Sequence, residues 1–269
     1  MTVLPSECLV QEIEHSEIQY MLDRMSAMQS MEGNPEGIEV KHFGMTVCLY
    51  SEHMPWAMFN TVKGMTSADA KYLDDIIAFY QVRGRAVQFE IVPSRADRNL
   101  LKSLAERGLY SSGFHNSLYT VPGDSEERLP ESIVIRELQQ DEFQLYATIH
   151  CKGTGLSENG IPYIAANNQI LHSRRGWKYF LAYCDMEPAA VGVMYMQEGA
   201  ASLTFAATLP EYRGRGLQQA LIRRRIREAA VQGCRLVVGQ CAFLSQSHRN
   251  MERAGMKLGY VRSTWIKQE

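Results

Sequence analysis

The amino-acid sequence predicts an α/β fold made of two copies of one domain in tandem. Strand-like runs and helical patterns follow one another in a similar order in the two halves of the chain. Between the halves lies Val121–Ser132 (VPGDSEERLPES), which combines prolines, a glycine and charges without apolar periodicity, as domain linkers do. Gly108 and Gly255 each end a predicted helix, and a glycine–aromatic pair follows each at nearly the same spacing. We therefore expect one domain at residues 1–122, a linker at 123–132 and a second domain at 133–269.

In the first half, the helices are predicted from apolar residues that recur at helical spacing. Leu73, Ile76, Ile77 and Tyr80 mark one such face. Short runs of alternating apolar and polar residues predict the strands. The expected helices are Ser6–Met31, Ala68–Val82 and Arg98–Arg107, and the expected strands are Ile38–Phe43, Met45–Tyr50, Trp56–Val62, Ala86–Val92 and Phe114–Val121.

The second half repeats this style, with consecutive strands joined by short turns and each later helix followed by a strand. The expected helices are Asp141–Cys151, Ile161–Arg174, Leu217–Gln232 and Ser247–Arg253. The expected strands are Ile133–Leu138, Tyr179–Cys184, Ala189–Met196, Ala201–Thr208, Arg235–Ala242 and Val261–Lys267.

Composition excludes several classes of function. With 45% apolar and 22% charged residues and a net charge of −2, the chain has ample material for a core and no overall attraction to nucleic acid or an anionic membrane. No apolar run reaches the ~18 residues of a membrane helix, and Met1–Ser16 lacks the basic start of a signal peptide. The six cysteines show no metal-ligand spacing, so we expect reduced thiols, no metal site and a cytoplasmic location.

The segment that carries chemistry is Thr208-Leu-Pro-Glu-Tyr-Arg-Gly-Arg-Gly-Leu217, where a predicted strand ends and a helix begins. Gly214 and Gly216 allow a tight turn and a close approach of the backbone to a ligand. The free N–H groups and the dipole of the following helix favour a phosphate or pyrophosphate. Arg213 and Arg215 add positive charge. The arginines at 223–225 and 227 read either as a solvated helix face or as contacts to a further phosphate.

With this loop, the sequence from about Ile133 to Lys267 resembles the GNAT superfamily of N-acetyltransferases, whose pyrophosphate loop reads R/Q-x-x-G-x-G/A. Arg213 and Gly216 match, while Gln218 stands at the sixth position, where glycine or alanine is usual. Arg235–Ala242 resembles the fifth strand of the family. A later segment is similar to the family's N…R-x-G-F pattern, and it contains Ser245, Asn250, Arg253, Gly255 and Met256.

The resemblance implies a mixed, largely antiparallel sheet with helices on both faces, and acetyl-CoA as cosubstrate without a metal. Backbone groups of Ala206, Ala207 and Thr208 would hold the pantetheine arm like an added strand, and one N–H there would stabilise the oxyanion. The pyrophosphate would lie on the amides of Arg213, Gly214, Arg215, Gly216, Leu217 and Gln218. Ser245 and Asn250 would lie beside the cofactor.

The resemblance fails at the general acid. Many relatives place a tyrosine five residues before the aromatic residue of the Gly-Phe pair, and this chain has Met251 there. Methionine donates no proton. Ser245 and Tyr260 are the candidate catalytic residues, with Ser247, a water or unassisted departure of the thiolate as alternatives.

The first half lacks the loop. At the corresponding position it has Gly64-Met-Thr-Ser-Ala-Asp69, with one glycine, no arginine and an aspartate that repels phosphate. We therefore expect acetyl-CoA only in the second half.

The function expected from these observations is acetyl transfer from acetyl-CoA to an amine of a small molecule. Acetylation of a protein or peptide amine is the alternative within the same class, and a non-catalytic acyl-CoA sensor is the alternative from another class. The expected partner is the small-molecule acceptor, with no nucleic acid and no membrane, and a homodimer is left open.

Overall fold

The computed structural model describes residues 5–123 and 129–267. Part of the expected linker, residues 124–128, lies outside the described residues. Contacts between Cα atoms divide the chain into two compact units, Met1–Ser117 with Leu258–Glu269, and Leu118–Lys257. Within the described part, no helix is both long enough and apolar enough to cross a bilayer.

The first unit has the strand order β1-β2-β3-β4-β11-β5. Ser6 begins α1 by accepting a hydrogen bond from the Leu9 amide at 3.2 Å, and Asp97 caps α3 in the same way. Leu73, Ile76 and Tyr80 of α2 pack into an apolar core with side chains of β4 and α3. The helices are α1 (Glu7–Gln29), α2 (Leu73–Gln81) and α3 (Arg98–Glu106), and the strands are β1 (Ile38–Phe43), β2 (Thr46–Ser51), β3 (Thr61–Lys63), β4 (Gln88–Ile91), β5 (Leu109–Thr120) and β11 (Lys257–Lys267).

The strand expected at Trp56–Val62 is mostly wrong. Ala57–Phe59 forms a 3₁₀ turn, and only Thr61–Lys63 is a strand. The Thr61 hydroxyl donates to the Ala57 carbonyl at 2.6 Å, and the Asn60 side chain accepts from the Ser51 amide at 3.1 Å. These local side-chain bonds compete with extended pairing.

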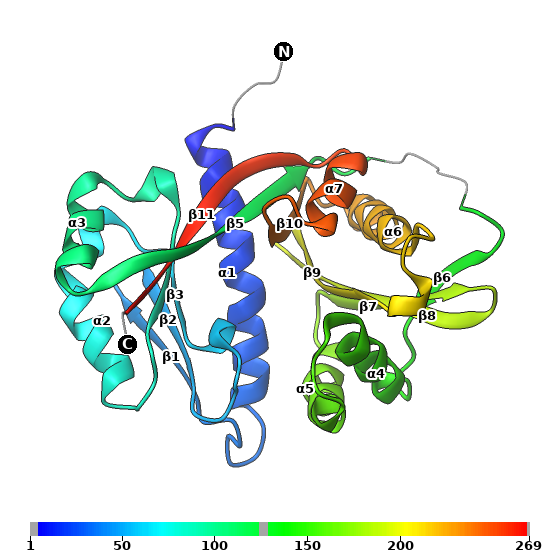
Figure 1. Cartoon of the computed structure of the whole chain (residues 1–269), viewed down its shortest axis with the longest axis horizontal. Coiled ribbons are helices and arrows are strands. Elements are labelled where there is room, and N and C mark those ends of the chain that lie inside the picture. Colours follow the sequence, from blue (N-terminus) through cyan, green and yellow to red (C-terminus); the bar gives the residue numbers. More distant parts are fainter. Residues whose placement is uncertain (1–4, 124–128, 268–269) are drawn as a thin grey trace. The chain divides into compact units, whose positions relative to one another are not determined.

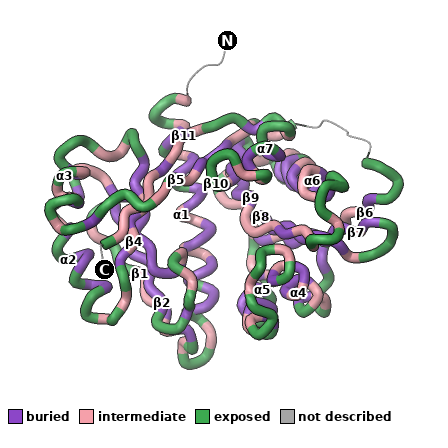
Figure 2. The backbone as a smooth tube through the Cα atoms, viewed as in Figure 1, coloured by how far each residue is buried: buried purple, intermediate pink, exposed green. Residues whose placement is uncertain are grey.

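The second unit has the strand order β10-β9-β8-β7-β6. Helices α4 and α5 cover one face of this sheet and α6 the other, as Figure 1 shows. The strands at the centre are almost entirely buried (Figure 2). The helices are α4 (Phe143–Thr154), α5 (Ile161–His172), α6 (Leu217–Val231) and α7 (Gln246–Arg253), and the strands are β6 (Ile133–Glu137), β7 (Trp177–Cys184), β8 (Glu187–Gln197), β9 (Ala200–Thr208) and β10 (Leu236–Ala242).

The two units repeat one arrangement, in which antiparallel strands lead to a parallel pair. The parallel pair is β3 with β4 in the first unit and β9 with β10 in the second. Gly108 and Gly255 follow α3 and α7 with φ of 75° and 84°, which is the left-handed conformation that glycine adopts at helix ends. The predicted fold class is confirmed, with a mixed, largely antiparallel sheet and helices on both faces.

The partner of the last strand differs from the expectation, which placed it in the second domain. Strand β11 pairs antiparallel with β4, with Ser263 opposite Ile91 and Ile266 opposite Gln88. Leu258–Glu269 therefore belongs to the first unit, although the second unit precedes it in the chain.

Candidate active site

The site begins where two parallel strands of the second unit separate. Pairing between β9 and β10 runs from Ala200 opposite Leu236 to Leu203 opposite Gly239. Pairing between β9 and β8 continues to Thr208 opposite Ala190. The segment after Leu203 therefore follows β8 past the end of its register with β10, which leaves an opening between β9 and β10.

A loop with two glycines connects this strand to α6. Pro210–Tyr212 makes a 3₁₀ turn, and Gly214 and Gly216 then take φ of 80° and 85°. Side chains other than glycine rarely adopt this conformation. A Cβ added at either glycine would meet no atom within 4 Å, so the backbone there faces open space. Helix α6 begins directly after Gly216, and its first amides have no partner within the helix.

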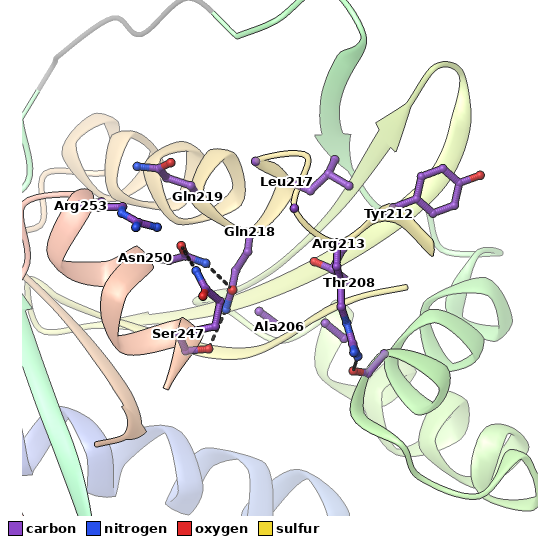
Figure 3. A pocket seen from close by; sticks show the side chains of 15 residues that line it. Ala206, Thr208, Tyr212, Arg213, Leu217, Gln218, Gln219, Ser247, Asn250 and Arg253 are labelled. Carbon is purple, nitrogen blue, oxygen red and sulfur yellow. Dashed lines mark hydrogen bonds between the residues drawn. The ribbon is translucent and has the colours of Figure 1, made fainter. Parts of the chain in front are cut away.

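Together the strand edge, the loop and α7 enclose a cavity of about 660 Å³ within the second unit (Figure 3). This volume lies in the range of about 300–1,000 Å³ that is usual for ligand sites. The lining residues are Gly153, Ala206, Ala207, Thr208, Tyr212, Arg213, Gly214, Gly216, Leu217, Gln218, Gln219, Gln246, Ser247, Asn250 and Arg253.

Most of the residues expected at the cofactor thus lie around one cavity, but Arg215 and Ser245 are not among the lining residues. The Arg215 guanidinium lies 3.3 Å from the carboxylate of Asp185 in the β7–β8 turn. The Ser245 hydroxyl caps α7 by accepting from the His248 amide at 3.1 Å.

Tyr260, the other candidate acid, lies on β11 in the first unit and is buried. Its hydroxyl donates to Glu17 of α1 at 3.0 Å. Burial raises the pKa of Tyr260 well above its usual value.

Arg213 joins the loop to α4. Its guanidinium donates to the Gly153 carbonyl at 2.9 Å, and Figure 3 shows it reaching toward the end of that helix. A Cβ on Gly153 would lie 2.9 Å from the Ala207 Cβ and 3.0 Å from the Thr208 carbonyl oxygen. Only glycine lets α4 approach β9 so closely. Gly153 was not among the predicted site residues, although a glycine within a helical pattern is a signal of such a contact.

A chain of side-chain amides crosses the cavity from α6 to α7 (Figure 3). Gln218 donates to the Ser247 hydroxyl at 2.7 Å, and Asn250 donates to the Gln218 carbonyl at 2.6 Å. Gln246 in turn donates to Asn250 at 3.0 Å. The residue that departs from the family pattern therefore bridges the two helices.

Two residues near the cavity have side chains unsuited to proton transfer or nucleophilic attack. Met251 packs against Gly239 of β10, where an added Cβ would lie 3.0 Å from its terminal methyl. Cys241 is buried, and burial raises the pKa of its thiol to about 11. The thiol therefore stays neutral near pH 7, where nucleophilic attack would need a thiolate.

The first unit is filled at the equivalent point, beside its own parallel strand pair. Lys63 of β3 and Glu90 of β4 form an ion pair, and Arg262 lies 3.2 Å from Glu90 and 3.0 Å from Glu17 of α1. The cavity lined by these residues is about 10 Å³, close to the space of one water.

In the segment that follows β3, the buried side chain of Asp69 is held by hydrogen bonds within the first unit. Asp69 is buried, and its carboxylate accepts from the Met45 amide at 3.2 Å and from the Thr46 hydroxyl at 2.9 Å. A negative charge thus stands where the second unit has its Arg-Gly-Arg-Gly loop.

A comparison with known protein families matches part of the second unit. Residues 135–256 match the acetyltransferase (GNAT) family. Residues 135–256 form a GNAT domain. The match spans the strand opening, the glycine loop and α7, which are the parts that surround the cavity of the GNAT domain.

Similar solved structures extend the likeness in fold to both units. A GCN5-related N-acetyltransferase from Kribbella flavida has 16% identity and a TM-score of 0.67, over 91% of this chain and 95% of that one. A tandem GNAT protein from the clavulanic acid biosynthesis pathway has 12% identity and a TM-score of 0.59, over 98% and 96%. A GCN5-related N-acetyltransferase from Sphaerobacter thermophilus has 16% identity and a TM-score of 0.59, over 75% and 67%. A search of curated proteins gave no match.

Proposed function

We propose that this protein is an acetyl-CoA-dependent N-acetyltransferase that acts on an amine of a small molecule, with its cofactor site in the GNAT domain. The observation that carries the proposal is the continuity of the cavity. One end is formed by the strand segment Ala206–Thr208, and the other by the Gly214–Gly216 loop at the start of α6.

The lining fits a long cosubstrate with phosphates. Arg213 and Arg253 supply positive charge, and the amides at the start of α6 add hydrogen-bond donors and the helix dipole. The backbone of Ala206–Thr208 can pair with an amide-bearing arm as a further strand would. These residues would bind the pyrophosphate and the pantetheine arm.

Acetyl-CoA would supply an activated acetyl thioester. The amine nitrogen would form a bond to the carbonyl carbon, the carbon–sulfur bond would break with release of the thiolate, and the proton of the amine would pass to solvent water. The chain's part is to hold the thioester in place and to offer a backbone N–H from β9 to the oxyanion. A thiolate is a tolerable leaving group near neutral pH, since thiols of this kind have a pKa near ~8.5. This accounts for a site with methionine at the position of the usual tyrosine.

The same methionine favours a second candidate, a domain that binds acyl-CoA without turnover. Thiol release from acetyl-CoA in the presence of a panel of small amines, amino acids and aminoglycosides separates the two. Rapid release with one acceptor supports transfer, whereas binding of acetyl-CoA with only background release for every acceptor supports the binding module. A preference for peptides over all small amines would move the acceptor to the protein class.

Binding itself has a direct test. Acetyl-CoA at a hundredfold excess over its Kd should stabilise the folded protein by about 2.7 kcal/mol. Unchanged melting at millimolar acetyl-CoA would contradict both candidates.

A further inference from the structure

A buried arginine lies beneath the strand segment that would hold the cofactor arm. Arg225 of α6 is only 1% exposed. Its Nε donates to the Leu221 carbonyl at 3.0 Å, and one terminal nitrogen donates to the carbonyls of Val193 at 2.9 Å and Thr204 at 3.2 Å. All three acceptors are neutral backbone oxygens, which belong to α6, β8 and β9.

Two of these oxygens belong to an irregularity in the sheet. Met194 pairs with Leu203 and Gly192 pairs with Ala206, so that Val193 alone stands opposite Thr204 and Phe205. Such a bulge bends a strand and changes its local twist. Arg225 therefore binds one carbonyl on each side of the bulge.

The bulge lies at the point where the site opens. The last residue of β9 in register with β10 is Leu203, directly before the bulge. The residues that line the cavity, Ala206–Thr208, come directly after it. The bend at the bulge thus determines the direction in which this strand segment leaves β10.

The opposite strand is adapted to the guanidinium. A Cβ on Gly192 would lie 3.2 Å from the Arg225 Cζ and Nε. Burial alone lowers the pKa of Arg225 to about 10, so the group stays charged at neutral pH. A buried charge without a carboxylate partner is costly for stability. Fold stability is therefore a poor explanation for its presence.

We propose that Arg225 is a positioning residue, which fixes the β8–β9 bulge and thereby aligns the backbone of Ala206–Thr208 with the pantetheine arm of acetyl-CoA. The inference rests on the proposed function, because the arm is the part of the cosubstrate that this strand segment would bind. The phosphates would bind the Gly214–Gly216 loop, which Arg225 does not contact in the structure.

The division of the cosubstrate into two parts gives the test. The Kd values of acetyl-CoA and of 3′-phospho-ADP, which lacks the arm, are measured by calorimetry for the wild type and for Arg225→Met. We expect the variant to weaken acetyl-CoA by about tenfold or more and 3′-phospho-ADP by less than about threefold. Arg225→Lys, which keeps the charge but reaches fewer carbonyls, should lie between the wild type and Arg225→Met. Arg175→Met removes an exposed charge that belongs to the same unit but does not line the cavity, and it should change neither Kd.

The outcomes are distinguishable. Equal weakening of the two probes, or no change in either for a variant that melts like the wild type, overturns the positioning role. A wild type that binds neither probe contradicts the proposed function instead. If Arg225→Met does not fold, Gly192→Ala provides the test. The added methyl group on β8 would lie 3.2 Å from the Arg225 guanidinium and would displace it. Gly192→Ala should weaken acetyl-CoA by about threefold and leave 3′-phospho-ADP unchanged, and equal effects on both probes would again refute the role.

Discussion

Gln218 occupies the loop position at which the GNAT pattern has glycine or alanine, and its side chain makes two hydrogen bonds across the cavity. A cosubstrate that enters between α6 and α7 has to displace these bonds, each worth about 0.5–1.5 kcal/mol. We expect Gln218→Ala to tighten the binding of acetyl-CoA by about three- to tenfold. Calorimetric titration measures this change.

Gln219→Ala is the matched control, because Gln219 also lines the cavity. The Kd of acetyl-CoA for the Gln219→Ala variant should stay close to that for the wild type. If Gln218→Ala weakens binding instead, the Gln218 amide contacts the cosubstrate directly and is not a barrier to it.

Single residues also show how far sequence reasoning reaches. Gly214 and Gly216 could be predicted as loop residues. Both adopt a positive φ in the turn between β9 and α6, and the need for glycine in such a turn is visible in the local sequence. The partners of Gln218 and the fit of Gly153 against Ala207 depend on contacts between segments far apart in sequence. No local pattern encodes the partners of Gln218, and the glycine at 153 signals a close contact without indicating that Ala207 is the neighbour.

At the level of the element, the start of α6 and the segment after β3 make opposite electrostatic environments. Gly216→Asp places a carboxylate, in a strained conformation, where the pyrophosphate would bind. We expect this variant to lose acetyl-CoA binding by about a hundredfold or more, a difference of about 2.7 kcal/mol. Gly64→Asp in the first unit should leave the Kd unchanged.

Melting of both variants provides the check on folding, since an added Cβ at Gly64 already meets the Met45 carbonyl at 3.2 Å. Equal losses of affinity in two folded variants would show that the cofactor sites are not confined to the GNAT domain. Gly216→Ala separates the effect of backbone strain from that of the charge.

Helix α1 brings a second set of charges into the first unit. Burial raises the pKa of Glu14 to about 7, although Arg95 lies 3.6 Å away and lowers it; Glu17, Lys63 and Glu90 also act on it. The native state therefore holds this proton more tightly than the unfolded chain does. Stability from this group is complete below about pH 4.5 and declines as the pH rises toward 7.

Glu14→Gln should flatten that decline and make the protein more stable than the wild type above about pH 7, by an amount on the order of a few kcal/mol at most. Urea unfolding at several pH values between 5 and 8 measures the difference. Parallel stability curves for the variant and the wild type would show that Glu14 is ionised in the folded protein.

The helices and strands with clear periodicity, such as Leu73–Gln81 and Ala200–Thr208, could be predicted because their patterns reflect local burial. The segment at Trp56–Val62 could not, since hydrogen bonds of Asn60 and Thr61 decide its conformation. The burial of Glu14 and Glu17 in the first unit could not be predicted either. The buried side of α1 carries both charged and apolar residues, so the sequence pattern does not show which side faces inward.

At the level of the whole chain, the alternation of Val261–Lys267 predicted a strand but not the unit to which it belongs. Because β11 pairs with β4, residues 1–132 alone lack a strand of their own sheet. We expect this fragment to show no cooperative unfolding transition, because the missing strand leaves β4 unpaired on one side and leaves the buried side chains of Glu17 and Glu90 without their contacts to Arg262.

Circular dichroism during heating, with the intact chain as reference, measures this. Addition of a peptide with the sequence of residues 257–269 is the control for a specific effect. A fragment that unfolds cooperatively without the peptide would show that the first unit is complete without β11.

The position of β11 also sets the order of events during synthesis. The first unit contains Leu258–Glu269, so it stays unfinished until the ribosome has made the entire GNAT domain. At about 5–20 residues per second, that interval is on the order of ten seconds. During it, the nascent first unit carries an open sheet edge, the kind of surface that chaperones cover and that promotes aggregation. Codon usage and chaperone supply during the synthesis of residues 118–257 should therefore affect the yield of folded protein more than changes elsewhere in the message.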